Sequence, residues 1–326
     1  MQAQLIALDW GTTSLRAYKL GPEGQVLEQR ALARGIMQLP SGQSATDGFE
    51  LAFAEACGDW LADNSAVPVI ACGMVGSAQG WREVPYCPGP ARIGDVAAGM
   101  SVISTRQGIQ VHLVPGVIQH SALPNVMRGE ETQVFGLLST LPASSTRQPL
   151  LVGLPGSHSK WVQVVDQRIE HFDTFMTGEL FAAASNHTIL GRTQQHDAPF
   201  DAAAFVRGVG VAQSQDGDIG VLSTIFSART LGLTGQLNGR QQADYLSGLM
   251  IGHELRALAQ VLRQRRGDPL LPAVVLIGNG SLCDRYRQAL ALCGFGDVSV
   301  AEQATERGLW SLAHAAGLLA SHSQEI

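Results

Sequence analysis

The sequence has little charge, and its charges form no block of one sign. Asp, Glu, Lys and Arg make up 15% of the residues, and the formal net charge is −6. Proteins that bind nucleic acids or anionic membranes use clustered Lys and Arg side chains to do so. The composition therefore argues against nucleic acid or a membrane surface as the main partner.

Cysteine is also scarce, and its spacing fits no metal-binding framework. The five cysteines stand singly at positions 57, 72, 87, 283 and 293, without a Cys-x-x-Cys pair or a His at metal-ligand spacing. An odd number without a pairing pattern is typical of reduced thiols in a cytoplasmic protein.

Targeting and membrane signals are absent as well. The chain begins with a strand pattern and lacks the basic, then apolar, leader of a secreted protein. No apolar run approaches the roughly 18 residues that a membrane-spanning helix needs. We therefore expect a cytoplasmic protein with no membrane partner.

The sequence does contain the material for a sizeable core. Its 326 residues are 45% hydrophobic and include 37 Gly. This length provides one large or two medium domains, and the composition is that of a folded chain rather than a disordered or fibrous one.

A strand, a turn and two more strands open the chain. Residues 5–8 are apolar and are followed by Asp9, Trp10 and the turn Gly11-Thr12-Thr13-Ser14. Alternating stretches at residues 15–20 and 26–31 predict the second and third strands.

The same pattern returns 145 positions later, where Gly11 falls on Gly156 and Ser14 on Ser159. Strands are predicted at residues 150–154, 160–165 and 169–175, with the turn Pro155-Gly156-Ser157-His158-Ser159 after the first of them. A unit used twice predicts a duplicated α/β fold, with two similar halves and a cleft between them.

Further elements follow from hydrophobic periodicity and turn signals. Helices are predicted at residues 48–64, 132–141, 241–265, 281–293 and 302–320, and strands at 67–72, 111–114, 273–277 and 298–301. The turn Gly278-Asn279-Gly280 lies between a strand and a helix, so backbone N–H groups and a helix N-terminus meet at a strand's carboxyl end. Ligands collect at such places in α/β sheets.

The first turn has the chemistry of a phosphate site. Gly11 lets the backbone approach a phosphate, and the hydroxyl groups of Thr12 and Thr13 can donate to its oxygens. Asp9 can hold Mg²⁺ directly or through water. In the alternative interpretation, Asp9 and Ser14 only satisfy the turn's backbone. The repetition at Gly156 favours phosphate binding.

Common nucleotide motifs are missing. The chain has no Gly-x-x-x-x-Gly-Lys-Ser/Thr loop and no protein-kinase signature. Gly278-Asn279-Gly280 lacks the further spacing of a dinucleotide fingerprint, which argues against a Rossmann dehydrogenase.

An ordered set of motifs resembles the 2-dehydro-3-deoxygalactonokinase family, within the actin, sugar-kinase and Hsp70 superfamily. The motifs are LDWGTTSLRAY, GMVGS with GW, VPGV, MRGEETQ, LPGSHSKW, FMTGELF and GNGSL, and they extend over nearly the whole chain. The resemblance implies a duplicated, actin-like (ribonuclease H-like) two-domain α/β fold with an inter-domain cleft. It also implies ATP-dependent phosphorylation of 2-dehydro-3-deoxy-D-galactonate on the C6 hydroxyl, a step of D-galactonate catabolism.

The resemblance also implies roles for individual residues. Asp9 would position Mg²⁺, and the turn Gly11-Thr12-Thr13 would face the β- and γ-phosphates of ATP. Gly156, Ser157 and His158 would lie opposite, and Gly278, Asn279 and Gly280 would line the adenosine. One departure is that the superfamily's second turn usually begins with Asp, where this chain has Leu154 and Pro155.

We expect the N-terminal actin-like domain, with the first phosphate turn and the sugar-acid side, at residues 1–135. The C-terminal actin-like domain, with the second phosphate turn and the adenosine site, is expected at residues 136–326.

Phosphoryl transfer to an alcohol needs an acceptor for the hydroxyl proton. Superfamily sugar kinases carry an acidic base at the helix that precedes the second half, and Glu130 and Glu131 occupy this place. In the alternative interpretation, the pair only complements the helix dipole. Adjacent helical side chains point about 100° apart, so one of the two faces the cleft, and the sequence does not distinguish them.

A substrate carboxylate calls for Arg or for well-placed N–H groups. Arg16, Arg82, Arg92 and Arg128 all lie near the expected site, and we favour Arg82 and Arg92 because their loop follows a first-domain strand. Each could instead be a solvated surface residue.

Two other functions remain open at this point. A kinase of the same fold could act on another sugar or sugar acid, since a fold does not fix its substrate. An ATP-dependent switch of the actin or Hsp70 kind is the alternative from another class, and it would hydrolyse ATP without a sugar. The low-charge, apolar surface also permits a homodimer.

Overall fold

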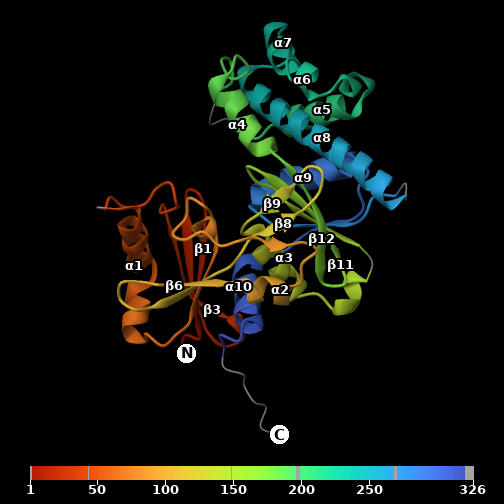
Figure 1. Ribbon diagram of the computed structural model, residues 1–326. Helices are drawn as coiled ribbons and strands as arrows, with labels where there is room; N and C mark the ends of the chain where they lie inside the picture. Colours follow the sequence, from red (N-terminus) through yellow and green to blue (C-terminus); the bar gives the residue numbers. More distant parts are fainter. Residues whose placement is uncertain (1, 43, 148, 196–198, 268–269, 320–326) are drawn as a thin grey trace. The chain divides into compact units, whose positions relative to one another are not determined.

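The structure, a computed structural model, describes residues 2–42, 44–147, 149–195, 199–267 and 270–319 (Figure 1). Contacts divide the chain into two units. Unit 1 comprises Met1–Gln148, Gln163–Phe172 and Ala301–Ile326, and unit 2 comprises Pro149–Val162 and Asp173–Val300. The domain boundary that we expected after residue 135 stays a prediction.

Unit 1 contains a six-stranded sheet in the order β3-β2-β1-β4-β7-β6. The strands are β1 (Leu5–Trp10), β2 (Leu15–Leu20), β3 (Val26–Leu32), β4 (Val69–Gly73), β6 (Ser101–Ser104) and β7 (Gln110–Leu113). The first three strands pair antiparallel as a meander, and β4 runs parallel to β1 and β7. The opening meander predicted from the sequence is therefore confirmed, although β1 extends through Asp9 to Trp10.

Helices cover both faces of this sheet. Ile6, Leu8 and Trp10 share a core with Phe49 and Phe53 of α1 (Ala45–Asp63), because alternate strand residues point to the same face. A capping box between Ser44 and Asp47 begins this helix. The other face lies beside α10 (Ala304–Ala315), which contacts β1, β4 and α3 (Glu130–Leu138).

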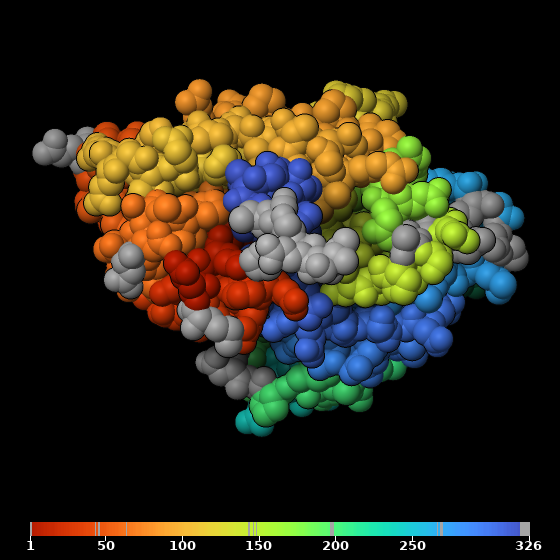
Figure 2. Space-filling view, turned by 90° about the horizontal axis from the view of Figure 1, so that it is seen from below, coloured from red at the N-terminus to blue at the C-terminus, as the bar shows by residue number. Residues whose placement is uncertain are grey.

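Two glycines allow α3 and α10 to cross closely. A Cβ atom on Gly136 would lie 1.8 Å from the Ala304 carbonyl oxygen, and one on Gly308 would lie 1.9 Å from that of Thr132. Both positions therefore require glycine, since any side chain would force the helices apart. α10 also contacts β1, so a helix late in the sequence packs on the strand that opens it, and Figure 2 shows dark blue atoms beside red and orange ones.

Smaller elements complete unit 1. A three-stranded sheet has the order β5-β8-β9, and its neighbour α2 precedes β6. The bounds are β5 (Cys87–Pro88), α2 (Ile93–Ala98), β8 (Val117–Gln119), β9 (Asn125–Met127) and the short 3-10 helices η1 (Pro22–Gly24), η2 (Met74–Gly76) and η3 (Ala143–Thr146). Neither the two-residue strand β5 nor the strands β8 and β9 are predicted from the sequence pattern.

Unit 2 contains most of a five-stranded sheet in the order β12-β11-β10-β13-β14. The strands are β10 (Leu150–Leu154), β11 (Ser159–Val165), β12 (Arg168–Phe175), β13 (Val274–Leu276) and β14 (Val298–Val300). β13 runs parallel to β10 and β14. This order repeats β3-β2-β1-β4-β7 of the first sheet, which confirms the duplication predicted from the sequence.

A helical cluster forms the rest of unit 2 (Figure 1). Its elements are α4 (Thr177–His187), α5 (Ala202–Gln213), η4 (Gln215–Ile219), α6 (Val221–Thr224), α7 (Ser227–Leu233), α8 (Gly239–Arg266) and α9 (Gly280–Leu292). The long helix α8 begins at an Asn238–Gln241 capping box, close to its predicted start at residue 241. α5 packs on α8 at Gly208 and Gly248, where a Cβ atom would lie 2.2 and 2.0 Å from the facing backbone oxygens.

The last predicted helix, at residues 302–320, is found as α10, and position 320 lies outside the described residues. Of the helices in the described ranges, none is long and apolar enough to span a membrane.

Candidate active site

The turn between β1 and β2 is closed by its own backbone. The Gly11 N–H donates to the Ser14 carbonyl at 2.8 Å, and the Gly11 and Thr12 carbonyls accept from Ile36 and Met37 at 3.1 and 3.0 Å. Residue 35 is a glycine because a Cβ there would lie 2.3 Å from the Thr12 oxygen. Residues 35–37 therefore hold the backbone of the turn in place, while the Thr12 and Thr13 side chains are exposed to solvent.

Asp9 lies on the last part of β1, opposite Arg16 of β2 and beside Cys72 of β4. Its carboxylate is 3.6 Å from the Arg16 guanidinium and its side chain is 21% exposed. The Cys72 thiol donates weakly to it, at 4.0 Å. Burial raises the pKa of Asp9, Arg16 lowers it, and the charges of Glu130 and Glu306 raise it further.

Three segments meet next to Asp9. Gly73 ends β4 with φ +88, and a Cβ on it would lie 2.7 Å from the Trp10 carbonyl oxygen of β1. Gly129 precedes α3 with φ +108, and a Cβ on it would lie 3.4 Å from the Cα of Gly73. Both glycines have backbone angles that other residues rarely adopt. They bring the start of α3, and so Glu130 and Glu131, to the carboxyl ends of β1 and β4.

The two glutamates differ in environment. Glu131 is fully buried at 0% exposure, and its carboxylate accepts from the Gly129 N–H at 2.7 Å and from the Thr132 hydroxyl at 3.0 Å. Burial, with a smaller contribution from the charge of Glu130, raises the pKa of Glu131 to about 8. Glu130 is half-buried and accepts from the Arg128 N–H at 2.9 Å. Of the two, Glu130 is the one that a ligand can reach.

The arginines considered for the substrate carboxylate also differ in exposure and in their partners. Arg82 is exposed, and Arg92 is exposed with its guanidinium donating to the Asp166 carbonyl at 2.7 Å. Arg128 is half-buried over the Tyr86 ring at 4.2 Å, and its Nη2 donates to the Val84 carbonyl at 2.8 Å.

The Arg128 guanidinium has unused donors. Its Nε and Nη1 are buried and without a hydrogen-bond partner, and no ion pair among the described residues includes it. Nη1 lies beside Gly76, where a Cβ would be 3.0 Å away. Unpaired buried donors are rare and call for a ligand or water. The sequence analysis placed Arg128 near the site without preferring it over the other arginines. Its buried, unpaired donors result from tertiary contacts, which the sequence does not show.

In unit 2 the second turn packs against the start of α4. A Cβ on Gly178 would lie 2.3 Å from the Gly156 carbonyl oxygen, and the Glu179 N–H donates to the Ser157 carbonyl at 3.0 Å. His158 pairs through its Nε2 with the Glu179 carboxylate. Thr177 is the first residue of α4, directly after the N-cap residue Met176.

Leu154 and Pro155 hold the position of the missing second aspartate, and Leu154 is buried at 5% exposure. Lys160 of β11 is buried at 6% exposure and donates to the Thr174 hydroxyl at 2.8 Å.

The turn Gly278-Asn279-Gly280 lies at the same edge of the sheet as the second turn. β10 and β13 run parallel, and a Cβ on Gly278 would lie 3.5 Å from the Pro155 carbonyl oxygen. The Asn279 side chain accepts from the N–H and hydroxyl of Ser281 at 3.1 and 2.7 Å, so it caps α9.

A cavity of about 410 Å³ lies against these elements. Its lining combines apolar side chains with a few polar groups, the usual character of a small-molecule site. The lining residues are Gly156, Ser157, Thr177, Gly178, Phe181, Ser247, Met250, Ile251, Ser281, Leu282, Arg285 and Tyr286. The sequence identified Gly156 and Ser157 but not the α8 and α9 residues, which come together only through helix packing.

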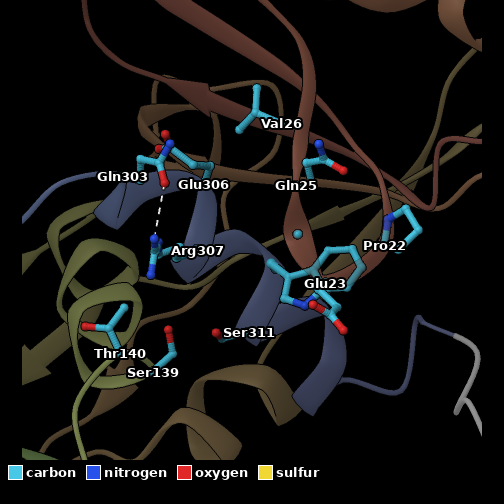
Figure 3. A pocket seen from close by; sticks show the side chains of 12 residues that line it. Pro22, Glu23, Gln25, Val26, Ser139, Thr140, Gln303, Glu306, Arg307 and Ser311 are labelled. Carbon is cyan, nitrogen blue, oxygen red and sulfur yellow. Dashed lines mark hydrogen bonds between the residues drawn. The ribbon is translucent and has the colours of Figure 1, made fainter. Parts of the chain in front are cut away.

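A second, larger cavity of about 690 Å³ lies in unit 1, between η1, the end of α3 and the start of α10 (Figure 3). Glu23, Glu306, Arg307 and Trp310 are among its lining, and Arg307 donates to the Gln303 side chain at 3.2 Å. None of the site residues predicted from the sequence lines it. Size alone therefore does not mark the functional site here.

The described residues contain no group of three or more His, Cys, Asp and Glu side chains arranged to hold a metal. Magnesium commonly binds through one or two carboxylates together with substrate phosphates. A single carboxylate at Asp9, partly exposed beside a turn rich in hydroxyl groups, fits that requirement.

The chain matches the family model of 2-keto-3-deoxy-galactonokinase over residues 9–312. It is 36% identical over 319 residues to a Rhizobium meliloti (strain 1021) protein named "Probable 2-dehydro-3-deoxygalactonokinase DgoK1", covering 95% of this chain and 96% of that one. It is 33% identical over 320 residues to the 2-dehydro-3-deoxygalactonokinase of Escherichia coli (strain K12), covering 97% and 99%.

Solved structures agree with these matches. A Sinorhizobium meliloti protein assigned as a 2-dehydro-3-deoxygalactonokinase superposes with a TM-score of 0.80 at 34% identity, covering 95% of this chain and 98% of that one. Component A of the (R)-2-hydroxyglutaryl-CoA dehydratase of Acidaminococcus fermentans gives a TM-score of 0.50 at 14% identity, covering 96% and 98%, and is similar in fold alone. The duplicated actin-like α/β fold predicted from the sequence is confirmed.

Proposed function

The chain belongs to the 2-keto-3-deoxy-galactonokinase family, and on this premise we propose that it phosphorylates 2-dehydro-3-deoxy-D-galactonate with ATP. The acceptor is the C6 hydroxyl, and the reaction is a step of D-galactonate catabolism. The observation that carries this proposal is the match to kinases of this name over 95% or more of the chain.

ATP is assigned to the cavity of unit 2. Its volume of about 410 Å³ suits a small-molecule ligand. Gly156 and Ser157 contribute backbone N–H groups for the phosphates, and His158 adds a donor when it is protonated. Gly278 and Gly280 flank Asn279, which fixes the start of α9 and thereby the wall formed by Ser281 and Arg285.

Asp9 is assigned to Mg²⁺, and the turn Gly11-Thr12-Thr13 to the β- and γ-phosphates. When bound, Mg²⁺ neutralises charge on the phosphate oxygens during transfer. Asp9 suits this role because its one strong partner, Arg16, is 3.6 Å away and leaves its oxygens accessible. The opposition of this turn to Gly156-Ser157-His158 across a cleft stays a prediction.

Glu130 is assigned as the general base that accepts the C6 hydroxyl proton. It is half-buried and close enough to Asp9 to raise the pKa of that carboxyl. Glu131 has its oxygens engaged by Gly129 and Thr132, which suits a residue that holds the start of α3 in place.

The sugar-acid carboxylate is assigned to the loop that follows β4. Arg82 and Arg92 stay candidates for it, as the sequence favours. Arg128 joins them, because its buried Nε and Nη1 lack partners and it lies beside Gly76 of the same loop.

The decisive test is ADP release with Mg-ATP and 2-dehydro-3-deoxy-D-galactonate, beside the gluconate-derived epimer and plain hexoses. Strong turnover with the first compound supports the proposal. Preference for another acceptor would identify a different sugar-acid kinase, and ATP hydrolysis independent of any sugar would replace the kinase by a switch.

Two further parts of the proposal concern the protein's setting. A kinase that consumes ATP in sugar-acid catabolism belongs in the cytoplasm, which fractionation of cells tests. Self-association as a homodimer is tested by sedimentation of the purified protein.

A further inference from the structure

One buried carboxylate in unit 2 has no part in the function proposed above. Glu254, on α8, has a side chain only 3% exposed. Burying a carboxylate is costly unless several hydrogen-bond donors surround it. A glutamate kept inside a helix cluster therefore needs an explanation beyond packing.

Donors from three other elements meet at this carboxylate. The Trp161 Nε1–H of β11 donates to Oε1 at 2.7 Å, and the Tyr286 hydroxyl of α9 donates to Oε2 at 2.8 Å. A side-chain hydrogen bond from Thr177, on α4, also acts on it, and the Ser159 hydroxyl contacts the Tyr286 hydroxyl at 2.9 Å. Burial raises the pKa of Glu254 to about 7, and the surrounding hydrogen-bonding side chains oppose that rise.

Above its pKa of about 7 the Glu254 carboxylate is ionised, and it then fixes the direction of a hydrogen-bond chain. Tyr286 has one hydroxyl proton and gives it to Glu254, since an ionised carboxylate can only accept. The contact between Ser159 and Tyr286 hydroxyls, at 2.9 Å, must then have Ser159 as the donor. The order of donation is Ser159 to Tyr286 to Glu254.

These partners border the cavity from several sides. Thr177 and Tyr286 line it, and Ser159 begins β11 directly after the turn Gly156-Ser157-His158. α8, which carries Glu254, contributes Ser247, Met250 and Ile251 to the same lining. One carboxylate on α8 thus connects β11, α4 and α9, and α4, α8 and α9 all contribute to the cavity lining.

We propose that Glu254 is a positioning residue for the nucleotide: its carboxylate fixes the hydroxyl orientations of Tyr286, Thr177 and Ser159 and so the shape of the cavity. This inference rests on the proposed function, in that the cavity is taken as the ATP site. Glu254 touches no substrate, and it acts through the donors that surround it.

Glu254→Gln is the direct test, because it keeps the shape and replaces one acceptor oxygen by an N–H donor. The substituted amide can still accept from Trp161, but its N–H group meets the Tyr286 oxygen and reverses the chain toward Ser159. We expect ATP to bind about tenfold more weakly, the change that loss of one charge-assisted hydrogen bond brings. Calorimetry with ATP alone measures this without any catalytic turnover.

His253→Gln is the matched control. His253 is the neighbouring residue on α8, and its Nε2 is paired with the Thr224 hydroxyl of α6 at 2.7 Å, outside the cavity lining. This variant should bind ATP as the native protein does. In steady-state assays, Glu254→Gln should raise the KM for ATP and leave the KM for the sugar acid within about twofold, a change that is small on the affinity scale.

Three results would overturn the inference: unchanged ATP affinity in Glu254→Gln, an equal loss in His253→Gln, or an equal rise in both KM values. If Glu254→Gln does not fold, Tyr286→Phe removes the link to Ser159 and leaves the carboxylate in place. It should weaken ATP binding several-fold, by loss of one hydrogen bond, and native affinity in this variant would contradict the inference. A native protein that binds no ATP would instead refute the proposed function.

Discussion

The two turns of the duplicated scaffold have the same backbone plan but different chemistry. In unit 1 the strand β1 carries Asp9 as its last residue but one, and Asp9 faces Arg16 in a partly exposed pair. The positions 145 residues later are Leu154 and Trp161, buried at 5% and 1% exposure. A charged pair in one half thus corresponds to an apolar pair in the other.

The two halves of the duplicated fold also differ in how accessible their carboxylates are. Asp9 has one cation at 3.6 Å and an exposed fraction of 21%, so its oxygens are open to a ligand. The carboxylate of the other half, Glu254, comes from a helix and accepts hydrogen bonds from all around it. In the function proposed above, the first turn holds a metal ion and the second holds phosphates by its backbone.

The largest effect is expected from removing the open carboxylate. Asp9→Asn should lower kcat by about 10³-fold, since electrostatic stabilisation of transferring charge is lost. The dependence of the rate on Mg²⁺ concentration should shift to higher values. Glu28→Gln, on β3 of the same sheet and at an exposed ion pair with Arg30, makes the same charge change and should leave kcat unaltered. Equal rates for Asp9→Asn and the native protein would show that the two turns do not differ in this way.

The next largest effect distinguishes Glu130 from Glu131. Glu130→Gln should reduce kcat by about 10²-fold or more, because the hydroxyl proton loses its acceptor. Glu131→Gln should chiefly lower stability, since its buried oxygens hold Gly129 and Thr132. Measuring kcat together with the melting temperature of both variants tests this, and a larger kcat loss in a stable Glu131→Gln would reverse the assignment.

The sequence predicted what depends on local spacing. The strand–turn–strand repeat, the long helix α8 and the acidic pair at the start of α3 are each continuous in sequence, so their residues could be found in order along the chain. The family motifs then gave the fold and activity class.

Features that depend on tertiary contacts could not be predicted from the sequence. The hydrogen-bond partners of Glu254 are at positions 161, 177 and 286, far from it in the chain. The burial of the Arg128 guanidinium likewise depends on its contacts with Tyr86 and Val84. The helices α6 and α7 gave no signal because large apolar side chains there are exposed, among them Leu222 at 93% and Leu233 at 65%, which blurs the helical period.

A smaller effect concerns the carboxylate of the substrate. Arg128→Gln should raise the KM for the sugar acid about tenfold, because the substrate carboxylate loses the two buried donors, Nε and Nη1, that would bind it. Arg82→Gln, at an exposed position of the same loop, is the matched substitution and should change KM less. The KM for ATP should stay unchanged in both. A larger effect at Arg82 would restore the preference that the sequence alone supports.

The smallest effect is on the pH dependence of stability. It compares one buried carboxylate from each unit, Glu131 and Glu254. The pKa of Glu131 is raised from 4.5 to about 8, by burial and then by Glu130, and that of Glu254 from 4.5 to about 7, by burial. Between pH 4.5 and these values the folded protein binds protons that the unfolded chain has released. The free energy of unfolding therefore falls as the pH rises through this window.

Glu254→Gln should flatten the fall in stability up to about pH 7, and Glu131→Gln should flatten it further, to about pH 8. The titrating neighbours are Glu130 and Cys72 beside Glu131, and Tyr286 beside Glu254. Melting temperatures measured from pH 5 to 9 for the native protein and both variants give the slopes. If the native slope survives in both variants, the two carboxylates are ionised throughout, and their hydrogen bonds outweigh the cost of burial in each unit.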